Sequence, residues 1–267
     1  MSGSVKDHYG KRSSPEIIKQ FFDRAREKNY KFTAKDLAAF DQFHIGGLVA
    51  TEHLADMVKV EAGSQILDIG SGIGGPARYL EKRFGSQVTG IDITPEYEQI
   101  AGELNQITGS NVRFMTGDAL CTGLPAAAFD LVWTQHVAMN IANRSQLYGE
   151  FARLLRPGGQ LAIYDVLKAS EETIDYPVPW SFDGSGSFLT TEQETISLIS
   201  RSGFALLQNK NVTEQAIEWL TLRVDKAPEI PGLSDIMGAG FRDAALNLAR
   251  QLKAGKLSVA QMLFERL

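Results

Sequence analysis

The sequence lacks the features of secreted, membrane-spanning and metal-binding proteins. Its 267 residues include one cysteine, Cys121, so no disulfide can form within the chain. No run of about eighteen apolar residues could cross a bilayer, and the first residues lack the apolar segment of a secretory signal. The four histidines and the cysteine show no metal-ligand spacing. We therefore expect a cytoplasmic protein with no metal site and no insertion into a membrane.

Basic clusters, internal repeats and low-complexity tracts are also missing. The formal net charge is −5, and the lysines and arginines are spread along the chain. A nucleic-acid partner is therefore not expected. Hydrophobic residues make up 43% of the chain and charged residues 22%, which is ordinary for a globular protein of this length.

Strand-like and helix-like segments alternate from Gln65 onward, after helices expected from Ser14 and Thr33. The expected strands are Gln65–Ile69, Gln87–Ile91, Val112–Thr116, Phe129–Thr134, Gln160–Leu167, Phe204–Lys210 and a last strand within Lys256–Leu267. The expected helices between and after them are Gly75–Phe84, Pro95–Thr108, Arg144–Leu155, Thr191–Ser202, Thr213–Val224 and Ile236–Lys253. This alternation predicts βαβ units and an α/β fold with a mostly parallel sheet covered on both faces.

A glycine-rich turn, "ILDIGSGIGGPARYL" (residues 66–80), follows the first expected strand, where α/β proteins bind ligands. Gly70, Gly72 and Gly75 satisfy the dinucleotide pattern G-x-G-x-x-G, with Asp92 at the distance of a ribose-binding acid. That pattern alone would indicate an NAD(P)-dependent oxidoreductase. However, Asp68 stands two places before the first glycine, and its carboxylate would repel a pyrophosphate but suit a cation.

The series Asp68, Gly70, Gly72 and Gly74 forms D-x-G-x-G-x-G and resembles motif I of the class I S-adenosylmethionine-dependent methyltransferases. "GIDITPE", "RFMTGDAL", "FDLVWTQHVAMNI" and "LLRPGGQLAIYDV" continue the resemblance in the expected order to about Val166. The stretch after strand four, "TQHVAMN", lacks the [DN]-P-P-[YF] motif of amino-methylating DNA enzymes. The chain is most similar to small-molecule methyltransferases of the quinone-biosynthesis, sarcosine/dimethylglycine and tocopherol types.

The resemblance implies a Rossmann-like three-layer sandwich with strand order 3-2-1-4-5-7-6 and an antiparallel last strand. It implies S-adenosyl-L-methionine as cofactor and S-adenosyl-L-homocysteine as product. The partner would be a small-molecule acceptor methylated at N, O or C, and the protein a monomer or homodimer. The cofactor-binding residues implied are Asp68, Gly70, Gly72, Gly74, Asp92, Ile93, Asp118, Ala119, Gln135 and Gln42.

Candidates for the chemistry lie after strand four and before strand one. His136 could orient or deprotonate the acceptor, and His44 lies in a segment that folds over the cofactor in similar enzymes. Each could equally be a hydrogen-bonded structural histidine. Tyr176, Trp180 and Phe182 could form an apolar acceptor wall together with Phe188, or pack onto the core.

Two units are expected along the chain. Residues 1–60 would form an N-terminal helical cap over the cofactor, and residues 61–267 the methyltransferase core. Within that core, residues 212–254 would be a helical insert acting as a lid. A non-catalytic protein that binds S-adenosylmethionine remains an alternative.

Overall fold

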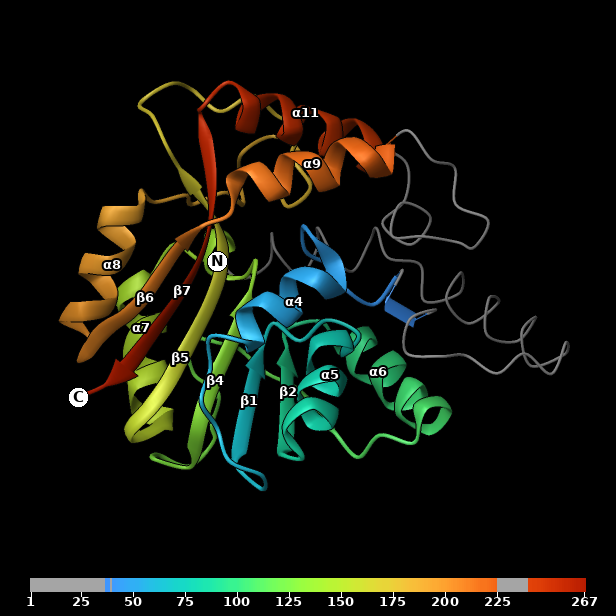
Figure 1. Cartoon of the computed structure of the whole chain (residues 1–267), viewed down its shortest axis with the longest axis vertical. Coiled ribbons are helices and arrows are strands. Elements are labelled where there is room, and N and C mark those ends of the chain that lie inside the picture. Colours follow the sequence, from blue (N-terminus) through green and yellow to red (C-terminus); the bar gives the residue numbers. More distant parts are fainter. Residues whose placement is uncertain (1–36, 39, 225–239) are drawn as a thin grey trace, which may run out of the picture.

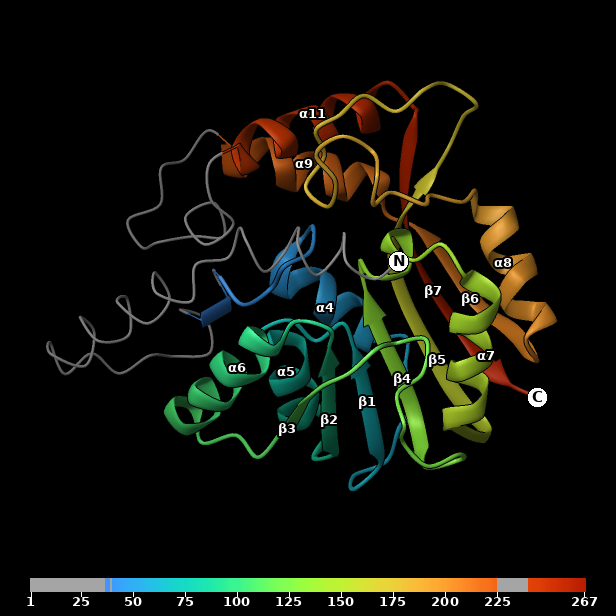
Figure 2. The same cartoon turned by 180° about the vertical axis from the view of Figure 1, so that it is seen from behind.

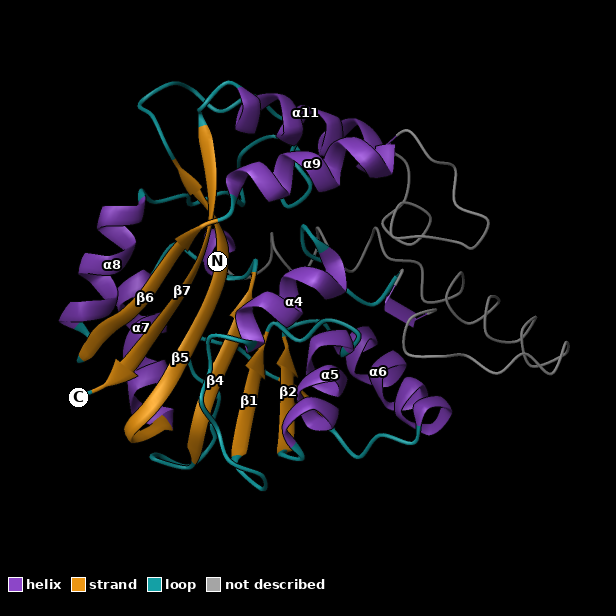
Figure 3. Cartoon of the chain, in the orientation of Figure 1, coloured by secondary structure: helices purple, strands orange, loops and turns teal. Residues whose placement is uncertain are grey.

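The computed structural model describes residues 37–38, 40–224 and 240–267. The helix expected from Ser14 and the start of the helix expected at Ile236–Lys253 lie outside these residues, and of the helix expected from Thr33 only residues 37–38 are described, as helical. Seven strands form one sheet in the order β3-β2-β1-β4-β5-β7-β6, as expected (Figure 2). The same strands except β3 are also labelled in Figures 1 and 3. The strands are β1 (Gln65–Ile69), β2 (Gln87–Asp92), β3 (Arg113–Thr116), β4 (Phe129–Gln135), β5 (Leu155–Lys168), β6 (Phe204–Asn211) and β7 (Leu257–Arg266).

Successive side chains of each central strand point to opposite faces of the sheet, where they pack into two separate hydrophobic cores. Ile66 of β1 and Leu131 of β4 belong to one hydrophobic cluster, whereas their neighbours Leu67 and Val132 belong to another. Both faces of the sheet are therefore buried, as expected for parallel strands covered by helices on each side.

The helices occupy both faces (Figures 1 and 2). They are α4 (Gly47–Ala55), α5 (Gly75–Phe84), α6 (Pro95–Thr108), α7 (Arg144–Leu154), α8 (Glu192–Arg201), α9 (Thr213–Val224) and α11 (Phe241–Lys253), with the short 3₁₀ helix η1 (Ala138–Asn140). Residues of α4, α5, α9 and α11 share the cluster that contains Ile66. Residues of α7 and α8 share the cluster that contains Leu67.

Strand β7 runs antiparallel to both β5 and β6, which confirms the expected orientation of the last strand. Several boundaries differ from expectation by one residue, and one strand differs by more, because β5 begins at Leu155 rather than Gln160. Phe129 pairs with Leu155 and Leu131 with Gln160, so the pairing shifts register over Pro157, Gly158 and Gly159. These residues form a bulge within the strand instead of a turn before it.

Helices α4, α9 and α11 lie beyond the carboxyl ends of the central strands (Figure 1). A Cβ atom built on Gly47, at the start of α4, would lie 3.7 Å from Trp219 of α9. The residues 40–58, hereafter the α4 segment, therefore lie between the sheet edge and α9. In the part of the chain that the structure describes, no helix is long and apolar enough to cross a membrane.

Candidate functional site

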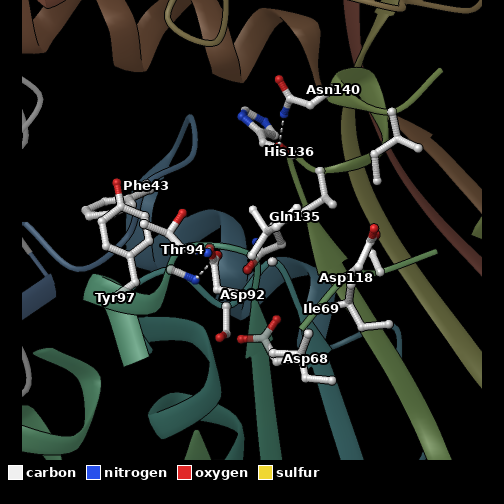
Figure 4. A pocket seen from close by; sticks show the side chains of 18 of the residues that line it. Phe43, Asp68, Ile69, Asp92, Thr94, Tyr97, Asp118, Gln135, His136 and Asn140 are labelled. Carbon is white, nitrogen blue, oxygen red and sulfur yellow. Dashed lines mark hydrogen bonds between the residues drawn. The ribbon is translucent and has the colours of Figure 1, made fainter. Parts of the chain in front are cut away.

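A cavity of about 520 Å³ opens at the carboxyl edge of the sheet. Its walls come from the loops after β1, β2, β3 and β4, together with residues of the α4 segment (Figure 4). This edge of a parallel sheet, near the reversal of strand order at β1 and β4, is where α/β proteins place their ligands.

Close approach of two loops requires glycine at position 70. Gly70 has a φ of +74°, and a Cβ atom there would lie 2.2 Å from Cγ2 of Val137 in the loop after β4. The amides of Gly70 and Ser71 both donate to the carbonyl oxygen of Ile91 in β2, at 2.7 and 3.0 Å. The loop after β1 is therefore fixed between the ends of β2 and β4.

Asp92 lies at the end of β2 and holds the glycine-rich loop through its carboxylate. Its Oδ2 accepts from the amide of Gly72 and its Oδ1 from the amide of Thr94, both at 2.9 Å. Burial raises the pKa of Asp92, while these amide hydrogen bonds oppose the rise. Each carboxylate oxygen keeps one further acceptor site, so Asp92 can still bind two hydroxyl groups of a ligand.

Asp68 is a buried carboxylate without the stabilisation that Asp92 receives. Its side chain is 2% exposed, and its Oδ2 has no hydrogen-bond partner among the described residues. Figure 4 shows the carboxylates of Asp68 and Asp92 close together on the same side of the cavity. Burial, and then the charge of Asp92, raise the pKa of Asp68 to about 8. A cationic ligand group would complete this arrangement, because it would supply the missing hydrogen-bond donors and offset the buried charge.

Asp118 lies on another wall, after β3. Its Oδ1 accepts from the amide of Leu120 at 2.9 Å, and Ala119 and Leu120 also line the cavity. The amide of Gly117 donates to the backbone oxygen of Asp92, which ties the loops after β2 and β3 together. The carboxylates after the first three strands thus surround one space.

Uncharged polar side chains line the other end of the cavity. His136 follows β4 with a φ of +56°, a strained conformation for a non-glycine residue, and its amide donates to the carbonyl of Tyr164 at 2.7 Å. Its ring centroid lies 4.8 Å from that of Tyr164 and 6.1 Å from that of His44. Its Nε2 has no partner among the described residues. Burial, and then His44, hold the pKa of His136 well below its usual range, so the ring is neutral near pH 7.

Asn140, at the end of η1, is a cavity residue that the sequence patterns did not identify. Its Nδ2 donates to the carbonyl of His136 at 3.2 Å, and its Oδ1 has no partner within the described part of the chain. Figure 4 shows it beside His136, opposite the two carboxylates. Asp165 accepts from the amide of Met139 at 3.2 Å and so steadies this turn. No strand end or glycine pattern marks Asn140, so only the fold brings it to the cavity.

Most of the residues expected from the sequence line this cavity. They are His44, Asp68, Gly70, Gly72, Asp92, Ile93, Asp118, Ala119, Gln135 and His136. Phe188, from the segment before α8, lines it as well, and the structure adds Phe43, Thr94 and Tyr97. The contact of each residue with a bound cofactor stays a prediction.

Two residues expected to bind the cofactor do not line the cavity. Gly74 begins α5 with a φ of +87°, and a Cβ atom there would lie 2.2 Å from the Phe114 ring, so packing explains this glycine. Gln42 is buried behind the wall, where its Oε1 accepts from Thr51.

The three aromatic residues expected to bind the acceptor do not line the cavity either. Trp180 is 3% exposed and packs in the core, where its indole N–H donates to Ser187 Oγ at 3.0 Å. Tyr176 packs against the same core cluster. Phe182 is 60% exposed. Phe188 is the aromatic residue of this segment that reaches the cavity.

Residues 67–163 match the family described as a methyltransferase domain. By sequence, the chain belongs to the class I S-adenosylmethionine-dependent methyltransferase family.

It is 30% identical over 187 residues to Methyltransferase GfsG of Streptomyces halstedii, an alignment that covers 67% of this chain and 66% of that one. It is 27% identical over 172 residues to the phosphoethanolamine N-methyltransferase of Plasmodium falciparum, covering 63% and 64% of the two chains. The chain thus spans slightly less than two thirds of these relatives.

Solved structures share the fold at lower identity. The putative sarcosine dimethylglycine methyltransferase of Galdieria sulphuraria has a TM-score of 0.65 at 23% identity, and the match covers 82% of the chain described here and 85% of the Galdieria chain. The [4+2]-cyclase SpnF has a TM-score of 0.63 at 22% identity, covering 81% and 79%. Because a cyclase shares the fold, the fold alone does not determine the reaction.

No group of three His, Cys, Asp or Glu side chains in residues 37–38, 40–224 and 240–267 could hold a metal ion.

Proposed function

We propose that the protein transfers a methyl group from S-adenosylmethionine to a small-molecule acceptor. The observation that carries the proposal is the buried Asp68 carboxylate, whose Oδ2 has no described partner and lies beside the glycine-rich loop. An ammonium group beside Asp68 would lower the raised pKa of its carboxyl and pair with the ionised form, whereas a pyrophosphate would raise that pKa further and gain no ion pair. This argues against the dinucleotide alternative.

The residues present fit the cofactor. Asp68 would hold its ammonium group, Asp92 its ribose hydroxyls and Asp118 its adenine amino group. When bound, the cofactor supplies an electrophilic methyl group for an in-line displacement. The chain's contribution is to orient the two reactants and to exclude water, which can account for several kcal/mol of the barrier.

His136 and His44 would act on the methyl acceptor. Burial lowers the pKa of His44 to about 4, so both rings are neutral at pH 7. The unpartnered Nε2 of His136 can bind a hydroxyl or amine hydrogen, and it can take a proton if the acceptor must lose one.

We also propose that residues 1–60 form a cap over the cofactor and residues 212–254 a lid. The position of α9 beside the α4 segment supports the described part of this arrangement. A lid there would exclude water once both reactants are bound.

The deciding experiment combines ligand binding with turnover. We expect S-adenosylmethionine and S-adenosylhomocysteine, each at about 100 times its Kd, to stabilise the protein by about 2.7 kcal/mol, and NADH to have no effect. A stabilisation by NADH alone would support the oxidoreductase instead.

Amines, quinols, phenols and isoprenoid-like acceptors would then be screened for production of S-adenosylhomocysteine. We expect at least one class to be methylated. Binding without turnover across the panel would favour a non-methylating protein, the alternative to which the cyclase neighbour draws attention.

A further inference from the structure

One hydroxyl oxygen joins the α4 segment to the end of β4. Thr51, on α4, is fully buried and lies behind the cavity wall. Its Oγ1 lies 2.9 Å from Gln42 Oε1, 3.0 Å from His44 Nε2 and 3.3 Å from Gln135 Oε1. His44 and Gln135 line the cavity, so Thr51 contacts two site residues without being one itself.

The orientation of the Gln135 amide follows from its second contact. The indole N–H of Trp133 can only donate, and it lies 3.0 Å from Gln135 Oε1. This fixes the oxygen of the amide toward Trp133 and Thr51. The amide nitrogen therefore points elsewhere, and it has no hydrogen-bond partner among the residues described. Gln135 thus offers a hydrogen-bond donor to a ligand.

The tautomer of His44 follows in the same way. The carbonyl oxygen of Gly47 can only accept, and it lies 3.0 Å from His44 Nε2, so this nitrogen must carry the hydrogen. Thr51 Oγ1 then accepts from the same N–H and shares its own hydrogen between Gln42 Oε1, the nearer acceptor, and Gln135 Oε1. Since burial keeps His44 neutral, its Nδ1 carries a lone pair and can accept a hydrogen bond.

We propose that Thr51 is a positioning residue, whose hydroxyl accepts from the Nε2–H that the Gly47 carbonyl requires on His44 and donates toward Gln135, so that a ligand meets one acceptor and one donor. The inference rests on the proposed function. It predicts an effect on the rate that exceeds the effect on cofactor affinity, because His44, which Thr51 holds, is assigned to the methyl acceptor.

The first test uses the wild-type protein without any ligand. ¹⁵N NMR of the ring nitrogens in histidine-labelled protein should show His44 with a protonated Nε2 and a bare Nδ1, its signals being assigned with a His44→Gln sample. A protonated Nδ1 with a bare Nε2 would overturn the proposal, because neither Gly47 nor Thr51 could then be accepting from His44.

The second test uses two substitutions at the same position. Thr51→Val keeps the shape and removes the hydroxyl, and we expect kcat to fall about tenfold, the loss of roughly one hydrogen bond, with the Kd of S-adenosylmethionine within about twofold. Thr51→Ser keeps the hydroxyl and should restore kcat to within about twofold of the wild type. A Val variant as fast as the wild type, or a Ser variant as slow as Val, would refute the proposal.

The outcomes separate the two proposals. If the wild-type protein neither binds S-adenosylmethionine nor turns over, the proposed function is wrong. The NMR result would still decide the hydrogen-bond arrangement around Thr51. If Thr51→Val does not fold, the same NMR measurement on the wild type and the kinetics of Thr51→Ser decide.

Discussion

The two ends of the cavity hold their ligand-facing groups by different means. Asp68 and Asp92 lie at one end, within β1 and at the end of the adjacent β2, where amides of the loops after these two strands hold Asp92. His44 and His136 lie at the other end, where both rings pack against Tyr164 of β5. One end is anionic and locally built, and the other is neutral and assembled by long-range packing. The difference suggests that cofactor binding and acceptor chemistry can be altered separately.

The largest difference between an effect on kcat and an effect on cofactor affinity is expected at His136. We expect His136→Ala to lower kcat about 100-fold, the usual scale of general-base loss, while the Kd of S-adenosylmethionine changes by less than about twofold. Steady-state kinetics and calorimetry would measure the two effects. Exposed His53→Ala is the matched control and should match the wild type in both. A kcat within about threefold of the wild type would mean that the acceptor needs positioning alone.

Gly70 tests the anionic end through its backbone. In Gly70→Ala, the new Cβ would collide with Val137 and the residue would keep a positive φ, so we expect a stability loss of about 1–2 kcal/mol. Displacing the loop should also weaken cofactor binding on the order of 100-fold. Gly102→Ala is the control, because no atom lies within 4 Å of its Cβ position and alanine favours the helix. Equal behaviour of the two variants would refute the close-approach argument.

Asp68 tests the same end through charge. Asp68→Asn should weaken S-adenosylmethionine binding about 10- to 100-fold by removing a charged hydrogen-bond acceptor, as measured by calorimetry. The exposed Asp56→Asn should bind normally. Unchanged affinity in Asp68→Asn would remove the main support for the cation assignment.

Asp68→Asn should also change how the free energy of unfolding depends on pH. We expect this effect to be smaller than its effect on cofactor binding. The pKa of Asp68 is about 8 in the folded protein and 3.8 in the unfolded chain, so the folded chain binds the extra proton between these values. Stability from Asp68 is therefore present below about pH 4 and is lost as pH rises through about 8. Without ligand, Asp68→Asn should be about 1–3 kcal/mol more stable than the wild type at pH 8.5 and equal to it near pH 4, by chemical denaturation. A constant difference across pH would contradict this.

Sequence patterns predicted the sheet and the anionic end well because both rest on local signals. Each carboxylate lies at or near the carboxyl end of a strand, and the glycines mark turns that only a short stretch of chain defines. The neutral end of the cavity is marked by weaker patterns in the sequence. Thr51 and Gln135 are 84 residues apart, and no local pattern shows that they meet.

Aromatic composition was a poor guide to the acceptor wall. Trp180 and Phe188 belong to the same segment, yet the former is buried with its N–H bonded to Ser187 and the latter reaches the cavity. Which way a loop side chain turns depends on the packing partners that the fold supplies, and composition does not contain that information.

The α4 segment is also joined to the far end of the chain. The hydroxyl of Tyr164 donates to the carbonyl of Ile45, and the amide nitrogen of Gln261 donates to the carbonyl of Ala50, across 211 residues. During synthesis, Ala50 therefore leaves the ribosome roughly 10–40 s before its partner, at about 5–20 residues per second. A nascent chain still lacking β7 has its glycine-rich loop but not this anchor for the segment above it, so the cavity is completed only after β7 has been synthesised.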